Sequence, residues 1–325
     1  MTEATLDSAM DPPRAPIAEP PAAPSAQPGA PSAQPGAAPQ PEAAALPTLS
    51  PSRAADFKTC PLLFRYRSID RLPEPPTADK ARGTLVHAVL EHLFDQPPAM
   101  RTRETAESLV RPQWERLLEQ EPDLAELFTA EQGEDREAFL VSAAALLEGY
   151  FAVEDPRRLE PAERETLIEA TIENQLLIRG YLDRLDISPA GDLRVVDYKT
   201  GGAPREAFEA RALFQLKFYA LVLWRTRGVV PRVLRLLYLK DAEICDYTPD
   251  EEELARFERT LVALWRAIEA ATAAQDFRPR RSKLCDWCSH QARCPEFGGA
   301  IPPFPQQLAA STVDSRQLKR ELPQP

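Results

Sequence analysis

VVDYKTG, residues 195–201, decides how the central part of this chain is interpreted. Its two valines and its tyrosine predict a buried β-strand, and Gly201 and Gly202 end that strand. Asp197 and Lys199 are two positions apart, so on a strand both side chains point to the same face. A buried strand that carries an acid and an amine on one face indicates a functional site.

A short turn sets the register of this strand against the one before it. The apolar segments 178–187 and 192–199 flank a turn that contains Pro, Ala and Gly, which is typical of a β-hairpin. Asp183 lies seven residues before Ala190 and Asp197 lies seven residues after it, so the two are expected to be directly opposite. Opposed side chains of an antiparallel pair share a face, with Cβ atoms about 5 Å apart.

The cluster predicted on this face would suit a divalent cation. Two carboxylates at that distance repel each other, and Mg²⁺ or Mn²⁺ between Asp183 and Asp197 would relieve the repulsion. Such an ion could polarise a phosphoryl oxygen and activate water, while Lys199 could position that water or stabilise developing charge. Asp186 is three residues further along and is expected to face the other way. The alternative is that Asp197 and Lys199 form an exposed ion pair, which contributes little to stability.

The two strands together carry a resemblance to a known family. GYLDR at 180–184 followed by DYKTG at 197–201 resembles the PD-(D/E)XK nuclease superfamily, and specifically its RecB-type exonuclease branch. The resemblance covers residues 49–297. It implies an α/β fold with a restriction-endonuclease-like core, in which a mixed central sheet is flanked by helices and carries a helical insertion.

The resemblance also assigns residues outside the hairpin. Gly83-x3-His87 lies on a predicted helix where the branch has a metal-binding histidine. Gln215 and Tyr219 are four residues apart, so they share one helix face, and the branch uses such a pair near the active site and the DNA strand. The branch further has a carboxylate upstream of the hairpin. Three residues qualify for it and the sequence does not choose among them: Glu165, Glu169 and Glu173.

The cysteines predict a second metal site. Three of the five form a tightly spaced triplet, Cys285, Cys288 and Cys294. In a cytosolic chain such a triplet indicates metal ligands before disulfides. The fourth ligand would be Cys60 or Cys245, or His290 in a zinc site, and Cys245 is expected to be a small core residue. Zinc and a [4Fe-4S] cluster both accept four thiolates, and spacing alone does not separate them.

A further resemblance favours the iron-sulfur cluster. One cysteine before the nuclease core and a C-x2-C-x5-C triplet after it are similar to the iron-sulfur nuclease domains of AddB-type proteins. The resemblance implies a structural [4Fe-4S] cluster on Cys60 and the triplet, which pins the N-terminal segment of the domain to its C-terminal segment.

Composition divides the chain into three parts. Residues 1–48 are rich in Pro and Ala, repeat APSAQPG at 23–29 and 30–36, and are expected to be a disordered tail. Residues 49–297 form the predicted nuclease domain with its iron-sulfur staple, and 298–325 an irregular tail. The acidic start argues against a secretory signal, and no long apolar run predicts a membrane span, so the expected location is cytoplasmic.

Hydrophobic periodicity gives the expected elements of the central part. Helices are predicted at 80–95, 103–120, 135–154, 205–227 and 250–276, and strands at 166–178, 178–187, 192–199, 232–241 and 243–249. Strands flanked by helices on both sides in sequence predict an α/β fold.

Charge offers a weak counter-argument to a nucleic-acid partner. The formal net charge is −11, whereas phosphate contacts need Lys and Arg. Local basic patches matter more than this sum, and two occur, FRYRSIDR at 64–71 and RPRRSK at 278–283. Either could also be ordinary solvated surface.

The sequence therefore predicts a metal-dependent DNA nuclease, an exonuclease on single-stranded ends that acts in DNA repair or recombination. It contains no GxxxxGK[ST] motif, so any unwinding would come from a separate helicase. Two alternatives remain open: a catalytically inactive DNA-binding or scaffold module of the same fold, and a zinc-stapled protein without a nucleic-acid role.

Overall fold

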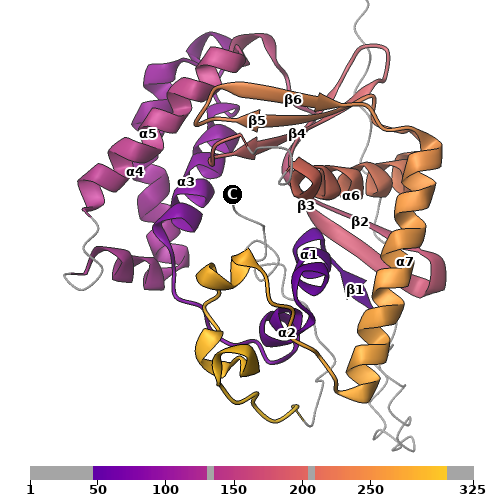
Figure 1. Ribbon diagram of the computed structural model, residues 1–325. Coiled ribbons are helices and arrows are strands. Elements are labelled where there is room, and N and C mark those ends of the chain that lie inside the picture. The colour runs from indigo at the N-terminus through magenta and orange to yellow at the C-terminus, as the bar shows by residue number, and fades with distance from the viewer. Residues whose placement is uncertain (1–46, 130–134, 204–208, 306–325) are drawn as a thin grey trace, which may run out of the picture. The chain divides into compact units, whose positions relative to one another are not determined.

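A computed structural model describes residues 47–129, 135–203 and 209–305, and its centre is a mixed sheet of six strands (Figure 1). The strands are β1 Thr48–Leu49, β2 Glu163–Ile172, β3 Leu176–Ile187, β4 Leu193–Lys199, β5 Val233–Tyr238 and β6 Glu243–Tyr247. The predicted N-terminal tail, apart from its last two residues, and the C-terminal tail from 306 onward lie outside the described residues. Among the described residues, no helix is both long and apolar enough to cross a bilayer.

Strand β3 organises the sheet. One edge of β3 pairs antiparallel with β2 along almost its whole length, while β1 and β4 pair with different halves of β3. The order then continues through β5, parallel to β4, to the antiparallel edge strand β6. The predicted hairpin of β3 and β4 and the predicted strands β5 and β6 are confirmed.

One strand prediction is wrong. The segment 166–178 is not one strand, because a 3₁₀ turn at Glu173–Gln175 divides it between β2 and β3. Gln175 has φ 61°, a left-handed conformation that glycine or asparagine more commonly adopts in such a turn. Since no glycine or proline marks the break, the apolar pattern runs through it unchanged.

Helices cover both faces of the sheet. Helices α3 Ala78–Leu93, α4 Arg103–Gln120 and α5 Arg136–Val153 form one layer, and their apolar side chains share a core with Val196 and Tyr198 of β4. Helices α6 Glu209–Arg227 and α7 Glu251–Ala274 belong to the other core, with Leu193 and Val195. Figure 1 shows the two groups of helices on opposite sides of the strands. The predicted helices are confirmed where the structure describes them; residues 205–208 of the fourth lie outside those ranges.

Burial on both faces explains the apolar character of the VVDYK strand. Residues of β4 alternate between the two cores, and neither face of the strand meets solvent. Apolar residues are therefore needed on both faces, except where a side chain belongs to a polar site. Asp197 and Lys199 point to the same face as Val195, as predicted from their spacing. They are buried at 1% and 9% exposure, which excludes the alternative of an exposed surface pair.

The beginning and the end of the domain are joined by hydrogen bonds to backbone carbonyls. The short helices α1 Pro51–Thr59 and α2 Pro61–Phe64 lead into a π-helical turn, Arg65–Ile69, and contact the segment after α7. Arg280 donates to the carbonyl of Lys58, Arg65 to that of Pro302, and the Tyr66 hydroxyl to that of Arg293. These bonds fix the C-terminal segment, coloured yellow in Figure 1, beside α1 and α2.

The predicted basic patch at 64–71 is not a free cationic surface. Arg65 is buried and pairs with Asp70 at 3.0 Å. Arg67 pairs with Asp56 and Glu74, both at 2.8 Å. These arginines neutralise internal carboxylates, so they are part of the packing between α1, the π-helical turn and the loop before α3.

Candidate active site

The pairing of β2 with β3 selects the upstream carboxylate. In this register Glu165 falls directly opposite Asp183. Glu169 is instead opposite Arg179, and Glu173 lies in the turn that separates the strands. Of the three glutamates that the sequence left open, only Glu165 therefore lies beside the hairpin aspartates.

The β3–β4 ladder places the second aspartate. Its last backbone pair is Arg184 with Val196, and one step further along the same register Asp183 is opposite Asp197. The register predicted from the length of the turn is confirmed for residues 184–187 of β3. At this step the backbone N–H of Tyr198 donates to Asp183 Oδ2 at 2.8 Å, so a side chain takes the place of the next ladder bond. Three adjacent strands thus bring three carboxylates into one row.

Glu165 has an unusual backbone for a strand residue. Its φ is 43°, in the left-handed region, which costs a non-glycine residue about 1–3 kcal/mol. Such strain persists where the surrounding structure imposes it, and it occurs most often at functional sites. At this position the Glu165 side chain contacts His87.

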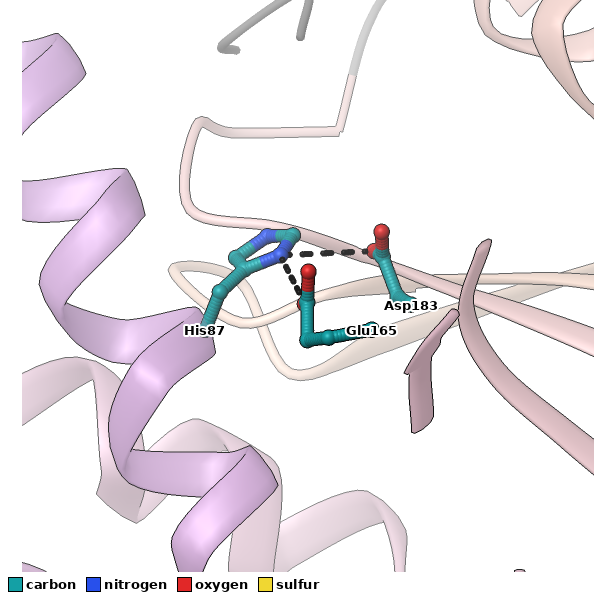
Figure 2. A group of neighbouring side chains, drawn as sticks. All are labelled: His87, Glu165 and Asp183. Atoms are coloured by element: carbon teal, nitrogen blue, oxygen red, sulfur yellow. Dashed lines mark hydrogen bonds and ion pairs between the residues drawn. The ribbon is translucent and has the colours of Figure 1, made fainter. Parts of the chain in front are cut away.

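His87 completes the group from helix α3 (Figure 2). Its Nδ1 lies 3.3 Å from Glu165 Oε1 and 3.5 Å from Asp183 Oδ2. Its Nε2 lies 3.0 Å from the carbonyl oxygen of Tyr198, which can only accept, so Nε2 carries a hydrogen. In the part of the chain that the structure describes, these three residues are the one group of three or more His, Cys, Asp or Glu side chains with ligand atoms within 4.8 Å of one another.

The electrostatics show that the group is short of positive charge. Burial alone would lower the pKa of His87, but the carboxylates of Asp183 and Glu165 outweigh it and raise the pKa to about 9. Burial raises the pKa of Asp183 to about 8, with His87 opposing the rise and Asp197 and Glu165 adding to it. The site therefore holds protons at neutral pH, and a divalent cation could replace them.

Lys199 is held in a buried chain of polar contacts. Its ammonium lies 2.7 Å from Asp197 Oδ2 and donates to Gln215 Oε1 at 3.0 Å. The Gln215 amide in turn donates to the Tyr219 hydroxyl at 2.9 Å. Helix α6 thus contacts the β4 lysine through Gln215, the residue whose four-residue spacing from Tyr219 marked it in the sequence.

Gly180 leaves room for the Tyr219 ring, which belongs to the same series of polar contacts. A Cβ atom at this position would lie 2.8 Å from the Tyr219 ring and 3.3 Å from Pro51. The first residue of the GYLDR motif is therefore small because the tyrosine ring and α1 pack directly against the β3 backbone.

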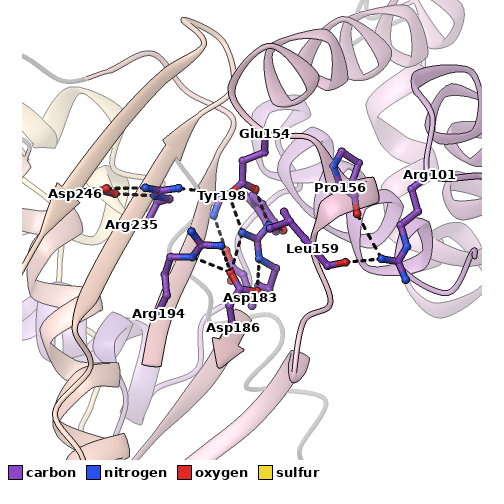
Figure 3. Close-up of polar contacts among 11 residues, drawn as sticks. Arg101, Glu154, Pro156, Leu159, Asp183, Asp186, Arg194, Tyr198, Arg235 and Asp246 are labelled. Atoms are coloured by element: carbon purple, nitrogen blue, oxygen red, sulfur yellow. Dashed lines mark hydrogen bonds and ion pairs between the residues drawn. The ribbon is translucent and has the colours of Figure 1, made fainter. Parts of the chain in front are cut away.

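A second polar network lies on the other face of β3 and β4 (Figure 3). Arg184 is completely buried, donates to Glu154 and to the Tyr198 hydroxyl, and lies 3.1 Å from Asp186. Asp186 also pairs with Arg194 at 2.8 Å. Asp186 is therefore occupied on the face away from Asp183, as predicted, and the network ties the end of α5 to the strands that carry the aspartates.

Comparison with known proteins identifies the family. The model of the PD-(D/E)XK nuclease superfamily matches residues 48–295, which includes every residue of the row of carboxylates and the lysine. The chain belongs to the PD-(D/E)XK nuclease superfamily. It is 26% identical to the Gene 69 protein of Mycobacterium phage D29 over 271 residues, 78% of this chain and 98% of the phage protein.

Two solved structures show the extent of similarity in three dimensions. A candidate exonuclease from Eubacterium rectale has a TM-score of 0.49 and 12% identity, and covers 75% of this chain and 87% of its own. The structure of SSO0001 has a TM-score of 0.36 and 17% identity, over 77% of this chain and 86% of its own.

The cysteines of this PD-(D/E)XK chain lie apart from the row of carboxylates. One pocket between α1, α2 and the C-terminal segment is lined by Cys60 and by the whole triplet, Cys285, Cys288 and Cys294. Cys245 is on β6, as expected of a residue outside that site. The sulfur atoms of these cysteines do not form a group within 4.8 Å of one another among the described residues.

Proposed function

We propose that this chain hydrolyses DNA phosphodiester bonds with the help of Mg²⁺ or Mn²⁺. The observation that carries the proposal is the row of Glu165, Asp183 and Asp197 across three adjacent strands, with His87 on one side and Lys199 on the other. Membership of the PD-(D/E)XK nuclease superfamily supports the same reaction.

The residues present fit a hard divalent cation. Carboxylate oxygens are the ligands that Mg²⁺ and Mn²⁺ prefer, and an imidazole can add a nitrogen. Asp183 and Asp197 would hold the ion, with Glu165 and His87 as further ligands. When bound, such an ion would polarise a phosphoryl oxygen and make water more acidic.

Lys199 is positioned to act on the nucleophile or on the charge that develops in the transition state. An ammonium has three protons, and contacts with Asp197 and Gln215 occupy two of them. The third is available to a water molecule or a phosphoryl oxygen. Because Gln215 is itself held by Tyr219, the ammonium stays in place without substrate, which is the preorganisation that electrostatic catalysis requires.

The decisive test is cleavage of end-labelled single-stranded and duplex DNA with Mg²⁺, Mn²⁺ or EDTA. Wild-type protein should cut only with the metal, and Lys199→Ala should reduce the rate by about 10²–10⁴-fold. Lys240→Ala removes an exposed lysine after β5 and serves as the matched control. Equal cutting by wild type and Lys199→Ala would refute the assignment. DNA binding without any cutting would instead favour an inactive binding module.

We further propose an exonuclease that acts on single-stranded ends in DNA repair or recombination and relies on a separate helicase for unwinding. The support is the RecB-type set of motifs, which places His87 ahead of the hairpin and Gln215 with Tyr219 after it. Circular single-stranded DNA distinguishes the mode of action, because an exonuclease leaves it intact and an endonuclease linearises it. Parallel assays with RNA define the nucleic acid.

A [4Fe-4S] cluster on Cys60, Cys285, Cys288 and Cys294 is proposed as a structural element. All four thiols line one pocket, and the backbone N–H groups of Arg280 and Ser282 donate to the sulfurs of Cys60 and Cys285 at 3.4 and 3.3 Å. Such hydrogen bonds are usual around cluster thiolates. Zinc also accepts four thiolates, so the resemblance to AddB-type iron-sulfur domains is what favours the cluster.

Metal analysis of anaerobically purified protein tests this second proposal. Brown protein with about four iron and four sulfide per chain is expected, with the visible absorbance lost in Cys294→Ala. Cys245→Ala is the matched control and should keep the colour. Colourless, zinc-loaded protein would refute the cluster and favour a zinc staple.

A further inference from the structure

The C-terminal segment exposes an aromatic ring that the fold does not use. Trp287 is 78% exposed, the highest value among the exposed large apolar residues of the described chain, whereas Trp114 is completely buried. Leu284, Phe297 and Ile301 of the same segment are exposed as well. An exposed tryptophan offers a large, rigid aromatic face, and such faces are enriched where proteins contact partners.

The residues before Trp287 are cationic and held in place. Arg280 is fixed by the carbonyl of Lys58, and the Arg281 guanidinium lies 5.2 Å from the centre of the Phe297 ring. Among the residues that the structure describes, no carboxylate lies within 4.0 Å of Arg280, Arg281 or Lys283. Arg278, by contrast, pairs with Asp276. In a chain of net charge −11, these three cations without carboxylate partners form a local site for anions.

The C-terminal segment as a whole has a positive net charge. Residues 278–297 contain five basic residues and two acidic ones, Asp286 and Glu296. By its sequence alone RPRRSK could be ordinary solvated surface, but the structure adds an exposed aromatic ring four residues after it. Cations for phosphates and an aromatic face for a base are the two elements of a single-strand binding surface.

The segment also leads toward the row of carboxylates. The carbonyl of Lys58 accepts from Arg280, and the Lys58 ammonium lies 4.1 Å from the centre of the Phe214 ring on α6. The next residue on α6 is Gln215, which holds Lys199. Through Lys58, Arg280 is thus linked to the end of α6 that carries Gln215, and a DNA strand bound at Arg280 would approach that end.

We propose that Trp287 stacks on a base of single-stranded DNA while Arg281 and Lys283 contact the flanking phosphates. The inference rests on the proposed function, since it names the form of DNA that the nuclease receives. Duplex DNA fits less well, because its base faces are already covered by their neighbours and a surface tryptophan has no face to meet.

The test is the affinity for fluorescein-labelled oligo(dT), measured by anisotropy in EDTA so that no cleavage takes place. Stacking of one base contributes about 1–3 kcal/mol, so Trp287→Ala should weaken binding about 5- to 150-fold, and Trp287→Phe should restore part of the loss. Arg281→Gln and Lys283→Gln should each reduce the slope of log affinity against log salt by about 0.7.

Matched controls separate this surface from general effects. Val141→Ala changes an exposed apolar residue on α5, and Arg158→Gln removes an exposed charge elsewhere; neither should change the affinity. Equal binding by wild type and Trp287→Ala, or no binding by the wild type, overturns the inference even if the nuclease assay succeeds. Loss of binding in Trp287→Ala with no cleavage by the wild type supports the surface and refutes the hydrolysis.

Discussion

Replacing Asp183 by Asn should stabilise the metal-free protein. The substitution keeps the shape of the side chain, and the amide oxygen can still accept from Tyr198 N–H. Folding raises the pKa of Asp183 from 3.8 to about 8, so at pH 7 the wild type must protonate a group that is ionised in the unfolded chain. About three pKa units separate 3.8 from pH 7, which corresponds to an upper limit of about 4 kcal/mol.

The sign of this effect fixes its pH dependence. Below pH 4 the carboxyl is protonated in both states and the two proteins should be equally stable. Between pH 4 and pH 8 the wild type loses stability relative to Asp183→Asn, and above pH 8 the difference stays constant. For a domain of this size about 4 kcal/mol corresponds to a melting temperature higher by roughly 10 °C.

Added metal should narrow the difference in stability between the two proteins. Mn²⁺ at one hundred times its Kd stabilises a protein by about 2.7 kcal/mol, and this gain should be small in Asp183→Asn. Thermal unfolding of both proteins in EDTA and in Mn²⁺, each at pH 5 and at pH 8, gives the eight melting temperatures to be compared. The exposed Asp123→Asn provides the control and should follow the wild type. An Asp183→Asn protein that melts below the wild type in EDTA at pH 8, or gains as much from Mn²⁺, would refute the reasoning.

Three further predictions concern the site and its support. Because the pKa of His87 is raised to about 9, protons compete with the metal for this side chain. Calorimetry should therefore show Mn²⁺ binding more tightly as the pH rises from 6 to 9, and a constant Kd would contradict this. Gln215→Leu should slow cleavage about 10- to 100-fold with unchanged Mn²⁺ affinity, since it frees the Lys199 ammonium; unchanged turnover would exclude that positioning role. Gly149→Ala should lower the free energy of unfolding, measured in urea titrations, by about 1–3 kcal/mol. A Cβ at this position would lie 1.7 Å from the Leu239 carbonyl oxygen, so α5 would have to move. An unchanged urea midpoint would show that α5 adapts without cost.

The hairpin could be predicted from the sequence because its information is local. A short turn with Pro and Gly determines which residues of β3 and β4 are opposite, and the need to bury one face keeps the register. The opposition of Asp183 and Asp197 follows from counting residues about Ala190. The same holds for Gln215 and Tyr219, whose relation depends only on the pitch of one helix.

Glu165 could not be selected because its position depends on a different turn. The break at Glu173–Gln175 contains no glycine or proline, so β2 and β3 look like one apolar run and their register cannot be counted. The left-handed φ of Glu165 also has no signature in a glutamate side chain. The basic patch predicted at 64–71 was wrong for a related reason. The acids that neutralise Arg65 and Arg67 lie within eleven residues of them in sequence, but only the π-helical turn brings them into contact.

The hydrogen bonds that join α1 and α2 to the C-terminal segment also set the order in which the domain can be completed during synthesis. Tyr66 and Arg293 are 227 residues apart, and at about 5–20 residues per second the ribosome needs roughly 11–45 s to make the second after the first. The carboxylates and Lys199 all precede residue 200, so the row of carboxylates leaves the ribosome well before the segment that carries Trp287. Translation therefore finishes the proposed DNA-binding surface last, after the strands that would cut the DNA.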